Sequence, residues 1–259
     1  MAADYGTLSL SPTPGSVSLY NFILSGLKSL WMSFVIENPL TWAFVQGRAH
    51  PRADVIGPFY VIGAPSIEFA PGKAVLGATQ DLKSNPLFLF SGRVLGPEGE
   101  PVEATLDLWQ ANTSGEYALA SYRNRGKVTT DSATGGFEVL TVPPAQYGIS
   151  PSVMRAAHIH AIITAPGYQS IITQFYLAPR NDPAPLDKDF TNWLRPKRTN
   201  NFMQCWAIPT DKGDRFWDLP ELDKLDERSK VVEEWNCRLQ SEGLRIGCGA
   251  FDVIRLNKA

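Results

Sequence analysis

The residues best suited to chemistry are His158 and His160, two of the three histidines in the chain. The surrounding residues 158–164 (His-Ile-His-Ala-Ile-Ile-Thr) predict a β-strand. On a strand, alternate side chains point to the same face, so the two imidazoles project together about 7 Å apart along the chain. Such a pair can supply two nitrogen ligands to one metal ion, and Arg155 adds a positive charge three residues upstream. The alternative is a chance pair on the polar face of a strand.

Two tyrosines, Tyr117 and Tyr147, lie in short motifs on the N-terminal side of this pair. The motifs, in chain order, are Gly57-Pro-Phe-Tyr60, Trp109-Gln-Ala-Asn112 with Gly115-Glu-Tyr117, Asp131 followed by Gly136-Phe137, Tyr147-Gly-Ile-Ser-Pro151, Arg155-Ala-Ala-His158-Ile-His160, and Ala165-Pro-Gly-Tyr168 followed by Thr173-Gln174. In order and spacing they resemble the motifs of the intradiol ring-cleaving dioxygenases, and most closely those of the catechol 1,2-dioxygenase branch. The resemblance covers about residues 55–178, together with 249–256, which is similar to the family's last strand.

The resemblance implies a ferric ion, Fe³⁺, held by two tyrosines and two histidines. These roles fall on Tyr117, Tyr147, His158 and His160. Phenolates are hard anionic ligands that suit ferric iron, and a trivalent metal can deprotonate a phenol whose reference pKa is about 10. We therefore expect a non-haem Fe(III) site at which oxygen activation needs no external reductant, because the electrons come from the substrate.

The same resemblance implies a reaction and further roles. Both atoms of O2 enter a catechol-type ring, and the product is of the cis,cis-muconate type. Tyr147 leaves the metal when the substrate binds and serves as a base. Arg155 stabilises negative charge on the substrate ring, and Gln174 forms hydrogen bonds around the metal or the bound oxygen. The alternatives are an ordinary surface arginine and an unremarkable glutamine at a strand end.

Three residues near the start of the matching region correspond to positions that wall the substrate ring in the catechol branch. They are Val55, Pro58 and Phe59. Their alternative role is plain core packing. The third histidine, His50, matches no ligand position and is expected to be a loop residue.

Length and composition fit this interpretation. A chain of 259 residues with 44% hydrophobic residues can form one large domain with a substantial core. The formal net charge of −2 gives no reason to expect a nucleic-acid partner. The three cysteines are far apart and form no CxxC pair, which favours neither a disulfide framework nor a zinc site. We expect a cytoplasmic protein whose partners are a small aromatic diol and O2.

Residues 16–37 form an apolar stretch with helical spacing, after a small and polar start (1–16) that is predicted to be disordered. Polar residues such as Asn21 and Lys28 are scattered through the stretch, which argues against a membrane span, and no Lys or Arg precedes it as a signal peptide would require. The catechol branch has a longer N-terminal helical region that forms a dimer interface. We therefore interpret the stretch as a helix buried by packing or in a homodimer. Contact with a membrane surface is the alternative.

The rest of the chain alternates short strand patterns with Gly/Pro turns, which favours a mainly β fold with an antiparallel β-sandwich core. A short N-terminal helical segment and a C-terminal loop and helix complete the expected architecture. We divide the chain into residues 1–56 (the start and the N-terminal helical segment), 57–178 (the sandwich with the iron site) and 179–259 (the C-terminal loop, helix and last strand). The predicted strands are 87–95, 104–109, 126–131, 137–142, 157–164, 170–177 and 249–256.

The C-terminal part departs from the family. Residues 178–222 are rich in proline and tryptophan, and they are expected either to cover the mouth of the site or to pack as an ordinary excursion. Residues 222–240 predict a helix that Gly243 stops. One face of that helix is predicted to carry Leu225, Val232, Trp235 and Leu239.

The replacement of the family's usual Arg-Pro by Arg155-Ala156 points to a substrate other than plain catechol. Three alternatives to the simple reaction stay open. They are cleavage of a large substituted catechol or hydroxyquinol, a non-oxidative lyase or cyclase step, and a non-catalytic binding sandwich.

Overall fold

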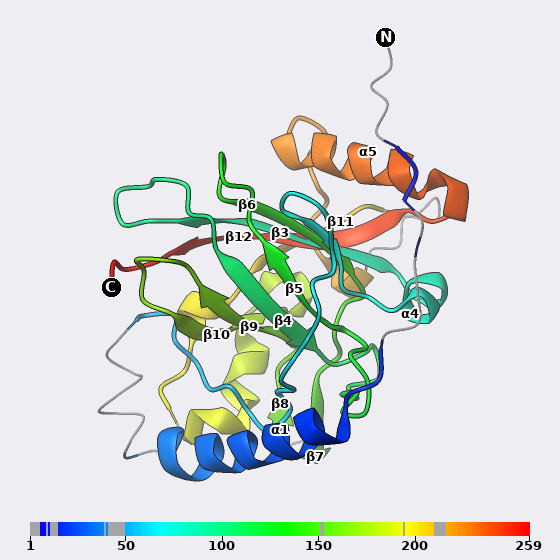
Figure 1. The fold of residues 1–259 in the computed structure, drawn as a ribbon. Coiled ribbons are helices and arrows are strands. Elements are labelled where there is room, and N and C mark those ends of the chain that lie inside the picture. The colour runs from blue at the N-terminus through cyan, green and yellow to red at the C-terminus, as the bar shows by residue number, and fades with distance from the viewer. Residues whose placement is uncertain are drawn as a thin grey trace.

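The structure is a computed structural model that describes residues 6–8, 10, 15–38, 40, 50–150, 153–193, 195–209 and 216–259. Two sheets pack face to face, and helices α1 and α5 lie at opposite ends of the molecule (Figure 1). The mainly β sandwich with a helical segment toward each end is therefore confirmed.

The larger sheet has six strands in the order β1-β2-β6-β3-β12-β11. Most pairs are antiparallel, but β12 runs parallel to β3, and β2 runs parallel to β6. The sheet is thus mixed where the sequence predicted an antiparallel one, because the final strand inserts between β3 and β11 and not at an edge. The strands are β1 (Glu68–Ala70), β2 (Lys73–Val75), β3 (Leu87–Leu95), β6 (Gly136–Thr141), β11 (Gln204–Ala207) and β12 (Ile246–Arg255).

The smaller sheet has four antiparallel strands in the order β10-β9-β4-β5, and a two-stranded hairpin, β7-β8, lies apart from it. Of these six strands, β4, β5, β9 and β10 agree with predicted strands to within two residues at each end, whereas the hairpin strands β7 and β8 were not predicted. The six strands are β4 (Thr105–Gln110), β5 (Arg125–Thr129), β7 (Tyr147–Ser150), β8 (Val153–Arg155), β9 (His158–Thr164) and β10 (Ile171–Tyr176).

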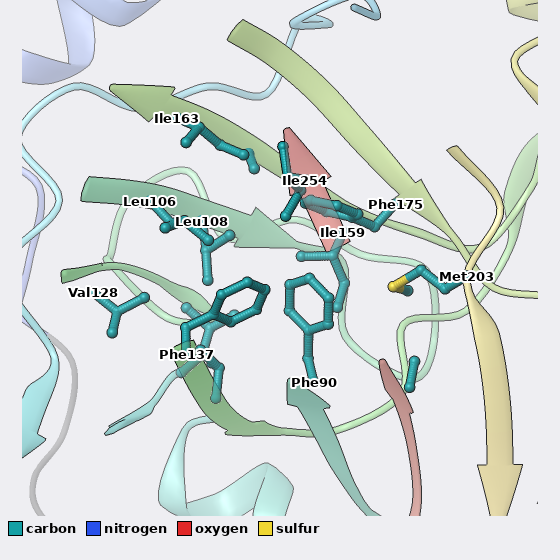
Figure 2. Close-up of a cluster of buried hydrophobic side chains, with 14 of the residues drawn as sticks. Phe90, Leu106, Leu108, Val128, Phe137, Ile159, Ile163, Phe175, Met203 and Ile254 are labelled. Carbon is teal, nitrogen blue, oxygen red and sulfur yellow. The ribbon is translucent and has the colours of Figure 1, made fainter. Parts of the chain in front are cut away.

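The main core lies between the two sheets, and one face of each sheet contributes side chains to it. The Phe90 ring lies at its centre, with its centroid 5.0 Å from that of Phe137 and 4.9 Å from that of Phe175, and aliphatic side chains surround these rings (Figure 2). Strand β9 contributes Ile159 and Ile163 to this core. Because side chains alternate along a strand, the other face of β9 is left for polar residues.

Helix α5 (Glu227–Leu239) begins after Asp226, whose side chain accepts a hydrogen bond from the Arg228 N–H. Its buried face carries Val232, Trp235 and Leu239, as predicted. The prediction for Leu225 was wrong: this residue precedes the helix and is 93% exposed. The helix end leads to Gly243 at φ +68°, a left-handed conformation that glycine adopts without strain, so the predicted stop is confirmed.

Helix α1 (Leu19–Trp31) continues into a π-helical turn, Met32–Ile36. The expectation that this helix is buried by packing within the chain was wrong, because its large apolar side chains point outward and Trp31 is 59% exposed. Leu19–Ile36 is long and apolar enough to cross a membrane. Signal sequences and the core helices of soluble proteins meet the same criteria of length and composition. Its polar side chains instead contact the body of the protein.

Other short elements complete the fold. The predicted disorder of residues 1–16 falls mostly outside the described residues, although Leu8 is buried and its N–H donates to the Arg238 carbonyl at 3.1 Å. Helix α4 (Thr79–Ser84) precedes β3. The C-terminal excursion contains the 3-10 turns Pro179–Asn181, Ala184–Lys188, Phe190–Trp193, Thr199–Asn201 and Phe216–Asp218.

Candidate metal centre

The two histidines of the predicted site lie on the face of β9 that points away from the core. In the sheet register, His160 pairs with Trp109 on β4 and with Gln174 on β10. The Trp109 indole stacks on the His160 imidazole with ring centroids 4.6 Å apart and planes only 8° from parallel. Both histidines are 1% exposed. The sheet and its cross-strand neighbours therefore fix the direction of both rings.

Three of the four predicted ligand atoms form a small triangle. His158 Nε2 and His160 Nε2 are 2.9 Å apart, and the Tyr117 hydroxyl lies 3.3 Å from the first and 3.2 Å from the second. For metal–ligand bonds of about 2.1 Å, two ligands at a right angle are about 3.0 Å apart. The triangle thus has the dimensions of three ligands that share one ion.

Tyr147 approaches the same point from another element. Tyr117 lies in the loop between β4 and β5, Tyr147 begins β7, and the two rings meet edge to face with centroids 5.5 Å apart. Gly115, at φ +83°, makes this approach possible, because a Cβ there would lie 2.9 Å from the Tyr147 Cβ. The structure therefore brings all four predicted ligands together, and the glycine of the Gly-x-Tyr motif allows the contact.

The histidines are neutral and can bind a metal through Nε2. His158 Nδ1 lies 2.5 Å from the Ala156 carbonyl, so it carries the proton and leaves a lone pair on Nε2. Burial, followed by the nearby Arg155 charge, lowers the pKa of His158 to about 3. Burial also lowers the pKa of His160 well below its usual value.

The tyrosines need a strongly charged cation if they are to ionise. Burial raises the pKa of Tyr117 well above its usual value and also raises that of Tyr147. Within the described ranges, no three His, Cys, Asp or Glu side chains group closely enough to hold a metal ion by themselves. A metal at this site would therefore rely on phenolate oxygens, and this donor set fits a hard trivalent ion bound by the two tyrosines and two histidines.

Arg155 and Gln174 lie side by side next to the four candidate ligands. Arg155 is 1% exposed, and its Nη2 donates to the Gln174 side-chain oxygen. The Gln174 amide donates in turn to the Val55 carbonyl at 2.7 Å. Burial alone would lower the pKa of Arg155, but the surrounding Tyr176, Asp189 and Tyr147 raise it, so the guanidinium keeps its charge.

The three expected wall residues lie in the segment before β1 but differ in exposure. The Phe59 ring stacks on Tyr117, with centroids 4.6 Å apart, and meets the Tyr147 ring at 6.2 Å. Val55 is buried, whereas Pro58 is exposed. Phe59 is therefore in position to contact a ring bound beside the two tyrosines.

Two buried acidic residues near the site were not identified from the sequence. Asp54 is completely buried and binds the Arg195 guanidinium through bonds of 2.7 and 3.1 Å, and it also accepts from the Tyr176 hydroxyl at 2.9 Å. Asp189 accepts from Arg155 Nε at 3.1 Å, and the Arg155 charge together with Thr191 lowers the pKa of Asp189 despite its burial. No sequence signal marks these residues, because the partners of each ion pair lie far apart in the chain.

Both of these ion pairs depend on the C-terminal excursion, which supplies Asp189 and Arg195. The excursion packs against β8 and β10 through isolated bridges, Met154 with Asp189 and Tyr176 with Phe202. Of the two expectations for residues 178–222, an ordinary packed excursion describes these contacts better than a cover over the mouth. The excursion also has a role at the site, because it supplies the ion-pair partners of Arg155 and Asp54.

A third missed residue, Arg125, braces the tyrosine loop. Its Nε donates to the Ala118 carbonyl at 2.9 Å and its Nη1 to the Phe59 carbonyl at 2.7 Å. Burial lowers the pKa of Arg125 to about 10. This side chain therefore ties the loop that carries Tyr117 to the segment that carries Phe59.

Comparison with known proteins agrees with this geometry. The family model described as Dioxygenase (Dioxygenase_C) matches residues 55–218. The chain is 32% identical over 205 residues to a 6-chlorohydroxyquinol 1,2-dioxygenase of Cupriavidus pinatubonensis, covering 72% of this chain and 66% of that protein. It is 31% identical over 160 residues to a catechol 1,2-dioxygenase of Acinetobacter baylyi, covering 54% and 49%. The chain thus spans about half to two thirds of the length of these relatives.

Solved structures show the same fold. A catechol 1,2-dioxygenase of Acinetobacter radioresistens, solved as an A72G mutant, superposes with a TM-score of 0.62 at 20% identity, covering 93% of this chain and 76% of that one. The 3-chlorocatechol 1,2-dioxygenase of Rhodococcus opacus 1CP gives 0.60 at 23% identity, covering 93% and 87%. At these identities the likeness is evidence for the sandwich fold alone.

Proposed function

Because the chain belongs to the intradiol ring-cleavage dioxygenase family, near its catechol 1,2-dioxygenase branch, we propose that it cleaves a catechol-type ring between its two hydroxyl-bearing carbons. Both atoms of O2 enter the product, so catechol and O2 together give cis,cis-muconic acid with no atom left over. The observation that carries this proposal is the convergence of the two histidine nitrogens and the Tyr117 hydroxyl within 2.9–3.3 Å of one another, with Tyr147 against them.

The cofactor that fits this donor set is Fe³⁺, held by Tyr117, Tyr147, His158 and His160. A ferric ion at this point would bind both oxygens of a catechol and draw electron density from its ring, which opens a ring carbon to dioxygen. The two neutral imidazoles leave the positive charge of the ion to be balanced by phenolates and by the ionised substrate.

Tyr147 is the side chain placed to take a proton from the substrate. It lies on the short β7-β8 hairpin, it is only half-buried, and its phenol interacts with both Tyr117 and Arg155. The Arg155 charge favours the ionised phenol and so opposes the effect of burial on the pKa of Tyr147. A tyrosine so placed can change partners without disturbing the main sheets.

Arg155 and the residues around it would stabilise charge on the ring. The guanidinium is buried, already paired with Asp189 and held against Gln174, so it needs little reorganisation when negative charge develops next to it. Phe59 would face one side of the bound ring, and Val55 and Pro58 would complete the wall. The stacking of Trp109 on His160 and the burial of both histidines would keep water from the inner side of the site.

The test is an oxygen assay on iron-loaded protein with a panel of catechol, hydroxyquinol and substituted catechols. We expect one O2 consumed per ring and a product heavier than the substrate by two oxygen atoms. A product of unchanged mass would replace the dioxygenase proposal with a cyclase, and a product that has lost a group without gaining oxygen would replace it with a lyase. Absence of turnover, together with no change in the visible spectrum on adding any diol, would point to a non-catalytic sandwich.

The panel includes hydroxyquinol for a specific reason. One relative carries the name 6-chlorohydroxyquinol 1,2-dioxygenase, and another, from Nocardioides simplex, is a hydroxyquinol 1,2-dioxygenase that is 29% identical over 65% of this chain. A ring with a third hydroxyl group is therefore the second candidate substrate class. A higher kcat/KM for hydroxyquinol than for catechol would select it.

A further inference from the structure

Helix α1 docks on the protein through its polar side chains. The Asn21 amide donates to the Tyr122 hydroxyl at 3.0 Å, and the Ser25 hydroxyl accepts from the Ile62 N–H at 2.9 Å. The Lys28 ammonium lies 4.3 Å from the centre of the Tyr60 ring. These contacts place the π-helical turn that follows α1, and the residue after it, close to the segment that walls the site.

Glu37 follows this turn, and its N–H donates to the Met32 carbonyl at 2.7 Å. The side chain is 3% exposed. One carboxylate oxygen accepts the N–H of Ile56, and the other accepts the N–H of Gly57 at 3.3 Å. A buried carboxylate from the N-terminal segment therefore binds two successive amides of the wall segment, which lies next to the metal ligands.

We propose that Glu37 is a positioning residue that holds the Val55–Phe59 segment against His160 and thereby determines how tightly the site binds the substrate ring. The proposal rests on the proposed function of the site. Glu37 itself does not contact the ligand residues in the structure; it acts through the backbone of Ile56 and Gly57.

The geometry of the wall segment explains why this contact matters. Gly57 has a φ of +72°, and a Cβ at this position would lie 3.5 Å from His160 Cε1, so the backbone passes directly beside a metal ligand. The Val55 carbonyl is already bound to Gln174. The two amides between these points, those of Ile56 and Gly57, have Glu37 as their acceptor. A displacement of this segment would therefore change the space left for a ring bound beside His160.

The charge state of Glu37 fixes the conditions of the test. Burial is the main effect and raises the pKa of Glu37 to about 7, and Asp54 adds to it, whereas the two amides and Arg155 oppose it. Above about pH 8 the side chain is mainly a carboxylate, so both oxygens accept hydrogen bonds. Measurements should be made there.

The test compares Glu37→Gln with Glu37→Asp, with Glu138→Gln as the matched control. Glutamine offers one acceptor oxygen and turns an N–H₂ group toward the second amide, whereas aspartate keeps two acceptors on a shorter side chain. Glu138 is a partly buried carboxylate that accepts from Lys73 and Trp235, on the sheet face that packs against α5. The control therefore removes the same kind of group at a distance from the site.

Two readouts apply to the same iron-loaded samples. Amide hydrogen exchange at Ile56 and Gly57 reports directly on the hydrogen bonds that these amides donate to residue 37, and it needs no turnover. In Glu37→Gln we expect exchange at both amides to become at least about tenfold faster and KM to rise about tenfold, because a hydrogen bond to a charged acceptor is lost. The kcat, the iron content and the visible absorption should stay close to wild type. Glu37→Asp should fall between wild type and Glu37→Gln, and Glu138→Gln should match wild type in all five measurements.

Three results would overturn the proposal. They are wild-type exchange at Ile56 and Gly57 in Glu37→Gln, faster exchange with an unchanged KM, and loss of iron from the variant, which would give Glu37 a merely structural role. If the wild-type protein cleaves no ring in the substrate panel, the proposed function fails. The exchange comparison would still show whether Glu37 holds the two amides.

Discussion

The histidine half and the tyrosine half of the candidate centre are held in opposite ways. His158 and His160 lie on a central strand of the four-stranded sheet and are buried, and a tryptophan stacks on the second. Tyr117 lies in a loop and Tyr147 on a separate two-stranded hairpin, and both are only half-buried. One half belongs to the sandwich itself, and the other half is attached to its surface.

Under the proposed function, this difference would give the two halves different tasks. Ligands fixed by a sheet cannot move far without unfolding it, so the histidines suit permanent binding of the metal. A ligand on a short hairpin can rotate away at little cost, which suits a tyrosine that exchanges a metal bond for a proton. The following predictions test the contrast, beginning with the largest expected effect.

We expect the largest effect, a loss of iron binding, when one of the two histidines is removed. His158→Ala or His160→Ala should weaken iron binding by more than about 100-fold, because loss of a direct ligand should exceed the 10- to 100-fold effect typical of residues that only support ligands. Metal analysis after gel filtration measures this effect. His50→Ala is the control, because the bonds of His50 within the described part of the chain go to the backbone of Arg255 and Arg52. Wild-type iron in both ligand variants would refute the assignment.

The buried Asp54–Arg195 ion pair near the histidine half should also be essential for the stability of the fold. Arg195→Met leaves the Asp54 carboxylate buried without its cation, so we expect a loss of about 3–5 kcal/mol in the free energy of unfolding. Denaturant titration measures it. Arg180→Met is the matched control, because the Arg180–Asp218 pair lies at the surface and should contribute little. Equal midpoints for the two variants would mean that the buried pair does not hold this half.

The wall segment beside His160 should respond to pH through Glu37. Its folded pKa, about 7, lies above the ordinary value of 4.5, so the folded protein binds this proton more tightly than the unfolded chain. Stability from this group is therefore present at low pH and declines as the pH rises from about 4.5 through about 7. Between about pH 5 and pH 8, the stability advantage of wild type over Glu37→Gln should shrink by up to about 3 kcal/mol. An advantage independent of pH would contradict the raised pKa.

The sharpest division lies within the attached half. Tyr147→Phe should retain part of the iron but slow binding of an anaerobic catechol by about 100-fold, because the base for a substrate proton is lost. Tyr117→Phe should mainly change the colour and the iron affinity. Stopped-flow absorbance follows both variants. Equal binding rates in Tyr147→Phe and wild type would remove the distinction between the two tyrosines.

Local patterns predicted the half that belongs to the sandwich. The period-two alternation of residues 158–164 placed both histidines on one face, and the structure shows that Ile159 and Ile163 indeed turn the other way into the core. The motif resemblance selected Tyr117 and Tyr147, and the structure shows why a glycine precedes the first of them by two residues. Spacing along the chain suffices where the ligands lie on one strand or near a tight turn.

The ion pairs and hydrogen bonds that support the site could not be predicted, because they depend on contacts between distant segments. Asp54 meets Arg195 across 141 positions, and Glu37 reaches amides 19 and 20 residues away. An isolated acid or arginine in a loop has no periodicity to reveal its partner. The orientation of α1 was missed for a related reason: its apolar residues follow helical spacing, yet a few hydrogen bonds from Asn21 and Ser25 decide which face meets the protein.

The position of β12 has a consequence for how this protein is made. The strand occupies the interior of the six-stranded sheet, between β3 and β11, yet about 150 residues separate the end of β3 at Leu95 from Ile246. A ribosome that adds about 5–20 residues per second needs roughly 10–30 s to cover that distance. During this time β3 has no partner on one edge, and all four proposed ligands, of which His160 is the last, are synthesised before β12. A nonsense mutation just before codon 246 would therefore leave all four proposed ligands in the sequence and still remove β12, the strand that joins β11 to the rest of the larger sheet.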